Sequence, residues 1–204
     1  MQKLIGRVAA VGGFALVLAA STTWAQDSVR VRGTIERVEG QTLLVKSRDG
    51  AELKVVLADN ALVVGIVKTS LSDIKPGSFV GVTGLPQADG SQKAVEVHIF
   101  PEAMRGTGEG HRPWDLRPQS TMTNANVEQT VAGVDGQTLT VKYKGGEKKI
   151  IVPPDTPIVT YVPGDKSELK PGVKIFIAGA EKKPDGTLQA PRVNFGKDGL
   201  TPPM

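Results

Sequence analysis

The chain of 204 residues contains no cysteine. Disulfide bonds, thiol redox catalysis and cysteine-ligated zinc sites are therefore excluded, and so is a lipid anchor on an N-terminal cysteine. Aromatic residues make up only 4% of the chain, and there are two histidines. Stability must come from aliphatic burial and backbone pairing, and few side chains are available to stack on bases or sugars.

The long apolar run of the chain lies at its N-terminus. Two basic residues precede an apolar stretch over residues 8–20, and residues 23–25 (Thr-Trp-Ala) match a cleavage signature with small residues at its first and third positions. This order is typical of a secretory signal peptide, so we predict that residues 1–25 are removed on export to the periplasm. A membrane anchor is disfavoured because the run is shorter than the roughly 20 residues that span a bilayer. We expect no membrane span in the mature chain.

Charge is spread along the chain rather than gathered in one segment. The sequence carries 25 basic and 21 acidic residues, a net charge of +4, and two of the bases lie in the predicted signal peptide. Nucleic-acid-binding proteins usually show a concentrated basic footprint. The mixed charge and the predicted export argue against a nucleic-acid partner and favour a protein or another component of the cell envelope.

The second half of the chain repeats the first. Residues 72–84 read SDIKPGSFVGVTG, and residues 167–179 read SELKPGVKIFIAG. Aligned pairs include Gly40 with Gly136, Val31 with Val127 and Val38 with Val134. We predict a duplicated domain with the following organisation: repeat 1 at 29–100, a linker at 101–125, repeat 2 at 125–196 and a C-terminal tail at 197–204.

Each repeat has the pattern of three strands, one short helix and two further strands. Segments such as VRVRGTIERV alternate apolar and polar residues, the period of a strand with one buried face. The repeated Lys-Pro-Gly ends the helix, because Pro restricts the residue before it and Gly supplies the positive φ of a turn. This order in about 70 residues resembles the oligonucleotide/oligosaccharide-binding (OB) fold, a five-stranded barrel. We predict an all-β protein with two tandem OB-like barrels; small β-sandwiches are the alternative.

The short helices carry capping signals. Ser70 and Asp73 have the spacing of a capping box, and repeat 2 keeps the device with Asp165 and Glu168. The aliphatic residue that follows each helix, Ile74 in repeat 1, is expected to plug the base of the barrel.

The linker offers the first candidate ligand site. Trp114 lies there between Arg112 and Arg117, and an aromatic ring flanked by guanidinium groups could stack on a sugar or a base. The alternative is structural: Trp114 would pin the linker into the groove between the barrels.

A second candidate is a basic patch in repeat 2. Tyr143 lies between Lys142 and Lys144 on the outward face of its strand, where it could bind an acidic glycan. The alternative is a solvated hairpin tip.

A soft-metal site is a third possibility. His98 and His111 lie near Met104 in the sequence, and imidazole and thioether groups suit copper and similar metals. No tight ligand spacing supports this set. His98 aligns with Asn194 on the outward face of its strand, which indicates a plain surface position. We also find no serine, histidine and acid in motif form and no spaced carboxylate pair, so we predict that the protein is not an enzyme and has no cofactor.

Three phrases raise a family likeness: VRVRGTIERVEGQTLLVKSRDG, HIFPEAMRGTGEGHRPWDLRPQSTMTNA and GEKKIIVPPDTPIV. They resemble small exported proteins of Alphaproteobacteria that are built from OB-like domains of unknown function, some of which are labelled metal transporter permeases. The resemblance implies a binding module and no particular functional residue. Our leading hypothesis is a non-enzymatic periplasmic binding or adaptor protein. A soluble metal-binding accessory of a transport system and an acidic-glycan-binding module are the alternatives.

Overall fold

The computed structural model describes residues 28–133 and 136–204, which form a mostly β structure, so the expectation of an all-β fold is confirmed. The predicted signal peptide lies outside the described residues. Within the two described ranges, no helix is long and apolar enough to cross a membrane. The strands are β1 (Ser28–Glu39), β2 (Thr42–Ser47), β3 (Glu52–Lys68), β4 (Phe79–Pro86), β5 (Gln92–Ile99), β6 (Gly110–Pro113), β7 (Thr121–Gly133), β8 (Gly136–Tyr143), β9 (Gly146–Val152), β10 (Ile158–Pro163), β11 (Lys174–Lys182) and β12 (Leu188–Gly196). The 3-10 turns are η1 (Leu71–Asp73), η2 (Glu102–Met104), η3 (Lys166–Glu168) and η4 (Lys197–Gly199).

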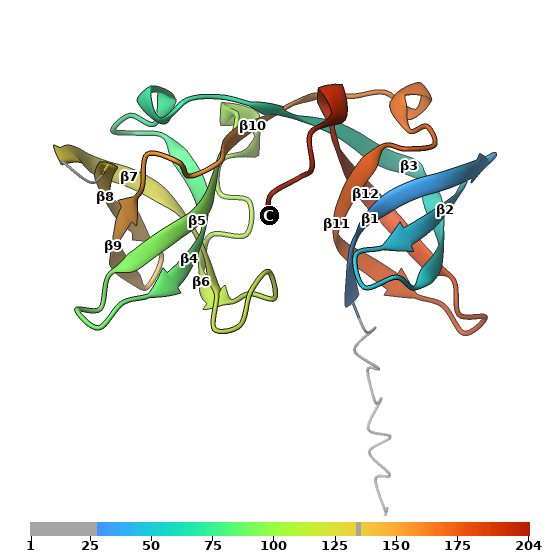
Figure 1. The fold of residues 1–204 in the computed structure, drawn as a ribbon, viewed down its shortest axis with the longest axis horizontal. Helices are drawn as coiled ribbons and strands as arrows, with labels where there is room; N and C mark the ends of the chain where they lie inside the picture. Colours follow the sequence, from blue (N-terminus) through green and yellow to red (C-terminus); the bar gives the residue numbers. More distant parts are fainter. Residues whose placement is uncertain (1–27, 134–135) are drawn as a thin grey trace, which may run out of the picture.

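Strands β1, β2, β3, β11 and β12 form a closed barrel, which we call half A (Figure 1). The ladder runs β12-β11-β1-β2-β3, and a parallel pairing of β3 with β12 closes it. Alternate side chains of each strand point inward and fill the barrel. The core of half A consists of Val31, Ile35, Leu43, Val45, Val55, Leu57, Leu169, Ile175, Ile177, Ala180, Leu188, Ala190, Val193 and Phe195.

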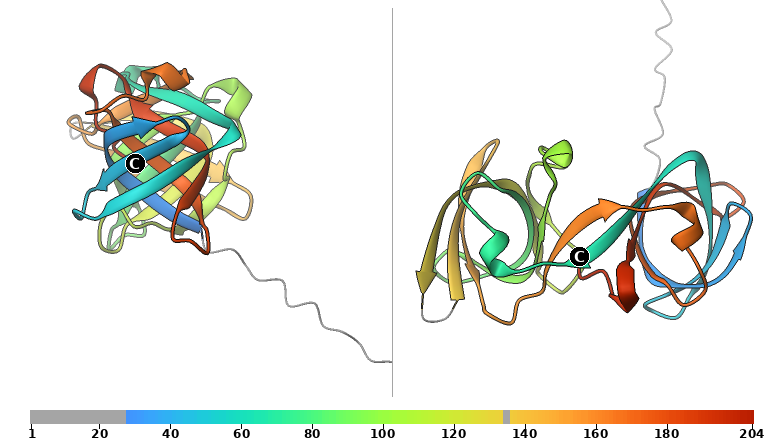
Figure 2. Two further views of the ribbon diagram at one scale, coloured as in Figure 1. Left: turned by 90° about the vertical axis from the view of Figure 1, so that its right-hand side faces the viewer. Right: turned by 90° about the horizontal axis from the view of Figure 1, so that it is seen from above.

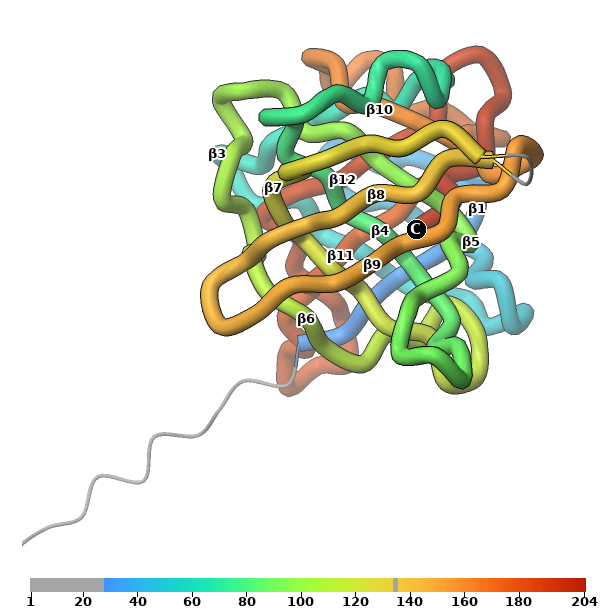
Figure 3. The backbone as a smooth tube through the Cα atoms, turned by 90° about the vertical axis from the view of Figure 1, so that its left-hand side faces the viewer, coloured from blue at the N-terminus to red at the C-terminus, as the bar shows by residue number. Residues whose placement is uncertain are grey.

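Strands β4, β5, β7, β8 and β9 form a second ring, which we call half B (Figure 3). The ladder runs β5-β4-β7-β8-β9, and β5 meets β9 in a short parallel pairing at Gln92–Ile150 and Lys93–Ile151. Strand β6 pairs with β7 beside this ring. The core of half B consists of Ile74, Val80, Val82, Ala94, Val97, Ala125, Val127, Leu139, Val141, Ile150, Val152 and Ile158.

Each half is built from both repeats. Half A joins the first three strands of repeat 1 to the last two strands of repeat 2, and half B joins the remaining strands (Figure 1). Half A therefore carries both blue and red segments in the figure. The expectation that each repeat forms its own barrel does not match this pairing. The alternation that predicts a strand is the same in both copies, so it cannot specify which copy supplies the partner strand.

The exchange follows from the course of β3 and β10. Strand β3 runs without a break from half A toward half B, and β10 crosses back beside it (Figure 2). The two strands pair antiparallel, with Ile66 opposite Tyr161. These residues hold the same place in their repeats, so the crossing lies on a pseudo-twofold axis. The contact between the halves is completed by an apolar cluster of Ile66, Met122, Val159, Phe176 and Met204.

The register of the repeat also differs from the sequence alignment. Val45 follows its strand partner Ile35 by ten residues, whereas Val141 follows its partner Val127 by fourteen. Val127 thus occupies the place of Ile35, and the predicted match of Val31 with Val127 is wrong. The β7–β8 hairpin is four residues longer than the β1–β2 hairpin, and an ungapped alignment cannot detect this.

The two short helices are present as the 3-10 turns η1 and η3, and both have the predicted capping boxes. The hydroxyl groups of Thr69 and Ser70 donate to the Asp73 carboxylate, which lowers the pKa of Asp73 to about 2. Ile74 lies in the core of half B and Leu169 in that of half A. Each turn therefore closes the half that contains the other repeat's first strand.

The linker at 101–125 is not a connection between barrels. Because of the exchange, it joins β5 to β7 within half B, and it folds as η2, β6 and the start of β7. The tail at 197–204 is ordered as well, since it forms η4 and ends at Met204, which is 1% exposed.

Candidate functional site

A basic pocket lies on half A, between the barrel and the chain segments that cover it. It has a volume of about 700 Å³. Strands β1, β2 and β11 form its wall, while Leu116 reaches it from the segment after β6 and Pro202 from the C-terminal tail. The lining residues are Arg32, Gly33, Thr34, Glu36, Lys46, Ser47, Arg48, Gly50, Leu116, Lys174, Ile175, Thr201 and Pro202.

Local chain geometry places the basic side chains. A Cβ at Gly33 would overlap the carbonyl oxygen of Lys46, so only glycine lets β1 approach β2 this closely. The β2–β3 turn is the predicted Asp-Gly hairpin, in which the Ser47 hydroxyl donates to Asp49 over 2.6 Å. The backbone amide of Arg48 donates to the carbonyl of Arg32 over 2.8 Å, which brings these two arginines to one wall of the pocket.

The charge of the pocket is unbalanced. Arg32 is neutralised, since its Nη2 lies 2.8 Å from Asp115 Oδ1 and its Nε donates to the carbonyl of Met204. Lys46, Arg48 and Lys174 have no ion pair within 4.0 Å among the residues that the structure describes. The acidic residue in the lining is Glu36. Three cations around an apolar floor form a site for an anion that also has an apolar face.

The predicted linker site adjoins this pocket through Arg32. The Cζ of Arg30 lies 4.1 Å from the centroid of the Trp114 ring, and that of Arg32 lies 5.9 Å away. Phe176 meets the same ring edge-on at 6.4 Å. Trp114 thus packs against half A from half B. These contacts favour the structural alternative over stacking on a ligand, because protein groups already surround the ring.

Charged groups around Trp114 interact with one another. Partial burial acts to raise the pKa of Asp115, but the hydrogen bond and charge of Arg32, together with Arg30, outweigh it and lower the pKa. Partial burial and the nearby charge of Arg30 lower the pKa of Arg112, whose Nη1 donates to the carbonyl of Gly108. Arg117 contributes through its backbone: its amide and carbonyl bind the Ser120 hydroxyl.

The predicted patch around Tyr143 lies on half B, away from the pocket lining. The ring of Tyr143 stacks on that of His111, with centroids 6.2 Å apart. The amide of Lys144 donates to Glu109 Oε1 over 2.9 Å, and both Lys142 and Lys144 are exposed. The patch remains a solvated surface with one aromatic ring already covered on one side.

The three predicted metal ligands have different surroundings. Within residues 28–133 and 136–204, no group of three or more His, Cys, Asp or Glu side chains could hold a metal ion. His111 Nδ1 lies 2.8 Å from the Thr123 hydroxyl, and burial followed by the charge of Lys148 lowers the pKa of His111. Met104 contacts Arg192 instead, with its sulfur 3.5 Å from Nη2.

His98 is not a surface residue, contrary to the prediction. It faces outward from its own ring, but Phe100 and, from the crossing strand β10, Tyr161 pack on it, with ring centroids 4.9 and 5.6 Å away, and it is 3% exposed. Its Nδ1 lies 3.1 Å from Glu96 Oε2, and Glu96 Oε1 accepts a 2.6 Å hydrogen bond from the Thr83 hydroxyl. Alternation predicted the correct face, but it could not reveal that Tyr161 of the other repeat packs on that face.

Tyr161 of β10 belongs to the same buried cluster as His98 and Glu96, since its ring packs edge-on against that of His98. Burial and then the charge of Glu96 raise the pKa of Tyr161, while Arg192 acts in the opposite direction. Glu96 and Arg192 hold equivalent places in the two repeats. The equivalent positions of the duplicated strands β5 and β12 thus carry opposite charges, and both act on Tyr161 of the crossing strand β10.

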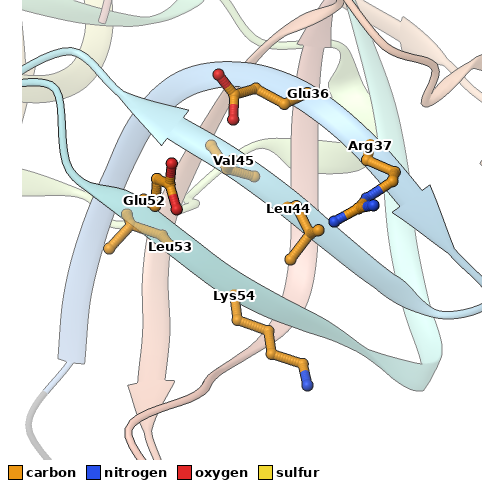
Figure 4. A pocket seen from close by; sticks show the side chains of 7 residues that line it. All are labelled: Glu36, Arg37, Leu44, Val45, Glu52, Leu53 and Lys54. Atoms are coloured by element: carbon orange, nitrogen blue, oxygen red, sulfur yellow. The ribbon is translucent and has the colours of Figure 1, made fainter.

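A second cavity of about 480 Å³ lies on the outer face of β1, β2 and β3 (Figure 4). It is lined by Glu36, Arg37, Leu44, Val45, Glu52, Leu53 and Lys54. Two acidic and two basic residues balance one another, and no aromatic ring is among the seven. This cavity lacks both the net charge and the stacking surface that would select a ligand.

Sequence reasoning missed Lys46, Arg48 and Lys174. The first two flank the predicted Asp-Gly turn, so their outward direction could have been inferred. Lys174 comes from the other repeat, and only the strand exchange brings it beside them. Comparisons of the chain with protein-family models, curated proteins and solved structures found no match.

Proposed function

We propose that this chain is an exported, non-enzymatic binding protein that holds an anionic ligand in the basic pocket of half A. The observation that carries the proposal is the set of Lys46, Arg48 and Lys174, three cations without an acidic partner around the apolar side chains of Leu116 and Ile175. Export rests on the predicted signal peptide, and the absence of an enzymatic role rests on the lack of a recognisable catalytic set.

The proposal includes an OB-like architecture for half A. Its support is the strand order β1-β2-β3-β12-β11 in a closed five-stranded barrel, with β12 parallel to β3. Such barrels bind oligomeric ligands on their strands and loops. The pocket opens beside the β2–β3 turn, so the anion would lie against the barrel wall.

Charge and apolar contact act together in this pocket. An exposed ion pair contributes only about 0.2–1 kcal/mol, so three cations alone would bind an anion weakly. An arginine can bind a carboxylate in bidentate fashion, which adds orientation. Burial of an apolar ligand face against Leu116, which is half-buried, would supply further affinity.

The test is calorimetric titration of residues 26–204 with digalacturonate and with neutral digalactose. We expect heat of binding with the acidic sugar only. The double variant Lys46→Gln, Arg48→Gln should lose it. The matched control, Lys142→Gln with Lys144→Gln, removes the same charge from the patch beside Tyr143 and should bind normally. Equal binding of both sugars, no binding of either, or loss of binding in the control alone would each contradict the proposal.

A further inference from the structure

The basic pocket does not stand alone on half A. A cavity of about 440 Å³ shares Lys174 with it, and a third of about 580 Å³ shares Thr201. The cavities of 440 and 580 Å³ have Lys197, Asp198 and Gly199 of η4 in common. The three cavities are therefore neighbours, and η4, which lines two of them, lies beside the crossing of β3 and β10 (Figure 1). We call these three neighbouring cavities the basic track.

Charge is concentrated along the track. Its basic residues are Arg32, Lys46, Arg48, Lys68, Lys170, Lys174 and Lys197. Its acidic residues are Glu36, Glu168 and Asp198. Arg32 is neutralised by Asp115, and Lys197 Nζ lies 2.8 Å from Glu168 Oε1. The other five basic and two acidic residues give the track a net charge of +3, more than the +2 that the sequence leaves to all residues after the predicted signal peptide. The remainder of residues 26–204 has a net charge of −1, so a polyanion would be drawn to this side.

We propose that the ligand is an acidic polysaccharide chain, which occupies the pocket and continues along the basic track past Lys174 toward Lys170. This inference rests on the proposed function, since it takes the pocket as the first part of the site. A single acidic sugar would engage the pocket alone. A longer chain presents carboxylates at regular intervals, and these reach the cations of the adjoining cavities in turn.

The lining favours a glycan over single-stranded nucleic acid. Proteins bind single strands by stacking bases on exposed aromatic rings. The one aromatic residue among the lining side chains is Phe195, which is only 3% exposed and has Lys197 Nζ 5.9 Å from its ring centroid. A uronate chain needs cations, hydrogen-bond donors and small apolar faces. Thr201, Leu200 and Val173 provide the uncharged part of that lining.

The experiment is calorimetric titration of residues 26–204 with galacturonate oligomers of two to eight units. We expect affinity to rise with length and then level off once the track is filled. Lys170→Gln should lower the affinity for the octamer about three- to fivefold, which is the contribution of one exposed ion pair. It should leave the affinity for the dimer unchanged. Lys46→Gln should lower the affinity for both the dimer and the octamer. Lys142→Gln on half B is the matched control, and unfolding temperatures check that each variant folds.

The outcomes distinguish a failure of the track from a failure of the pocket. If the dimer binds but length and Lys170→Gln have no effect, the track is wrong and the pocket stands. If no oligomer binds, the proposed function itself fails. Tighter binding of an oligothymidylate of eight nucleotides than of the galacturonate octamer would overturn the glycan as ligand class.

Discussion

The amide of Gly77 donates a 2.7 Å hydrogen bond to the carbonyl of Val127, which belongs to the other repeat. The amide of Gly172 makes the same bond to Ile35, also over 2.7 Å. The Lys-Pro-Gly turn of each repeat is thus fastened to the first strand of the other. Strand exchange is reciprocal, and neither repeat contains a complete barrel of its own.

Separated repeats should therefore not fold alone. We expect fragments 26–100 and 101–204 to lack a cooperative thermal transition by circular dichroism when each is pure. Mixed or co-expressed, they should form one complex of the size of residues 26–204 in size-exclusion chromatography, because each supplies strands that the other lacks. Two independently folded fragments would contradict the exchange.

Gly81 should be intolerant of a side chain. A Cβ at this position would overlap the ring of His98, which is held by Glu96 and by ring contacts with Phe100 and Tyr161. We expect Gly81→Ala to lower the free energy of unfolding by about 1–3 kcal/mol, the usual cost of overpacking. Gly133→Ala is the control, since its Cβ would have only an ordinary contact at 3.5 Å. Chemical denaturation measures both, and equal stability of the two variants would refute the prediction.

Loss of the Glu96 carboxylate should destabilise the fold more than loss of any single hydrogen bond that it accepts. Its replacement by Ala leaves the Thr83 amide and His98 Nδ1 without their buried acceptor. We expect Glu96→Ala to cost about 2–4 kcal/mol of unfolding free energy, and Thr83→Val, which removes one hydroxyl, about 1 kcal/mol. Urea titrations compare them. A larger loss in Thr83→Val than in Glu96→Ala would show that the carboxylate does not organise this cluster.

The stability that the η1 turn contributes should depend on pH. The pKa of Asp73 is lowered to about 2 by hydroxyl and amide donors of Thr69 and Ser70. Its folded-state pKa lies below its unfolded value, so the stability that it contributes is present above about pH 4 and is lost as pH falls toward 2. Asp73→Asn should thus lower the unfolding temperature at pH 7 and have little effect at pH 2. An equal difference at both pH values would exclude this linkage.

The sequence by itself determined the local structure. Two-residue alternation specified the strands, the Asp-Gly turn and the capping boxes formed as predicted, and the duplication is evident from residues 72–84 and 167–179. These features depend on neighbours in the chain, so local patterns are sufficient to predict them.

Tertiary structure alone decided which strands pair and which outward side chains are buried. Both repeats offer chemically equivalent partners to each strand, and the choice is made by the course of β3 and β10 between the halves. The same choice buries His98 and brings Lys174 beside Lys46 and Arg48. Contacts between residues more than a hundred positions apart create the pocket, and no periodicity in a single repeat encodes them.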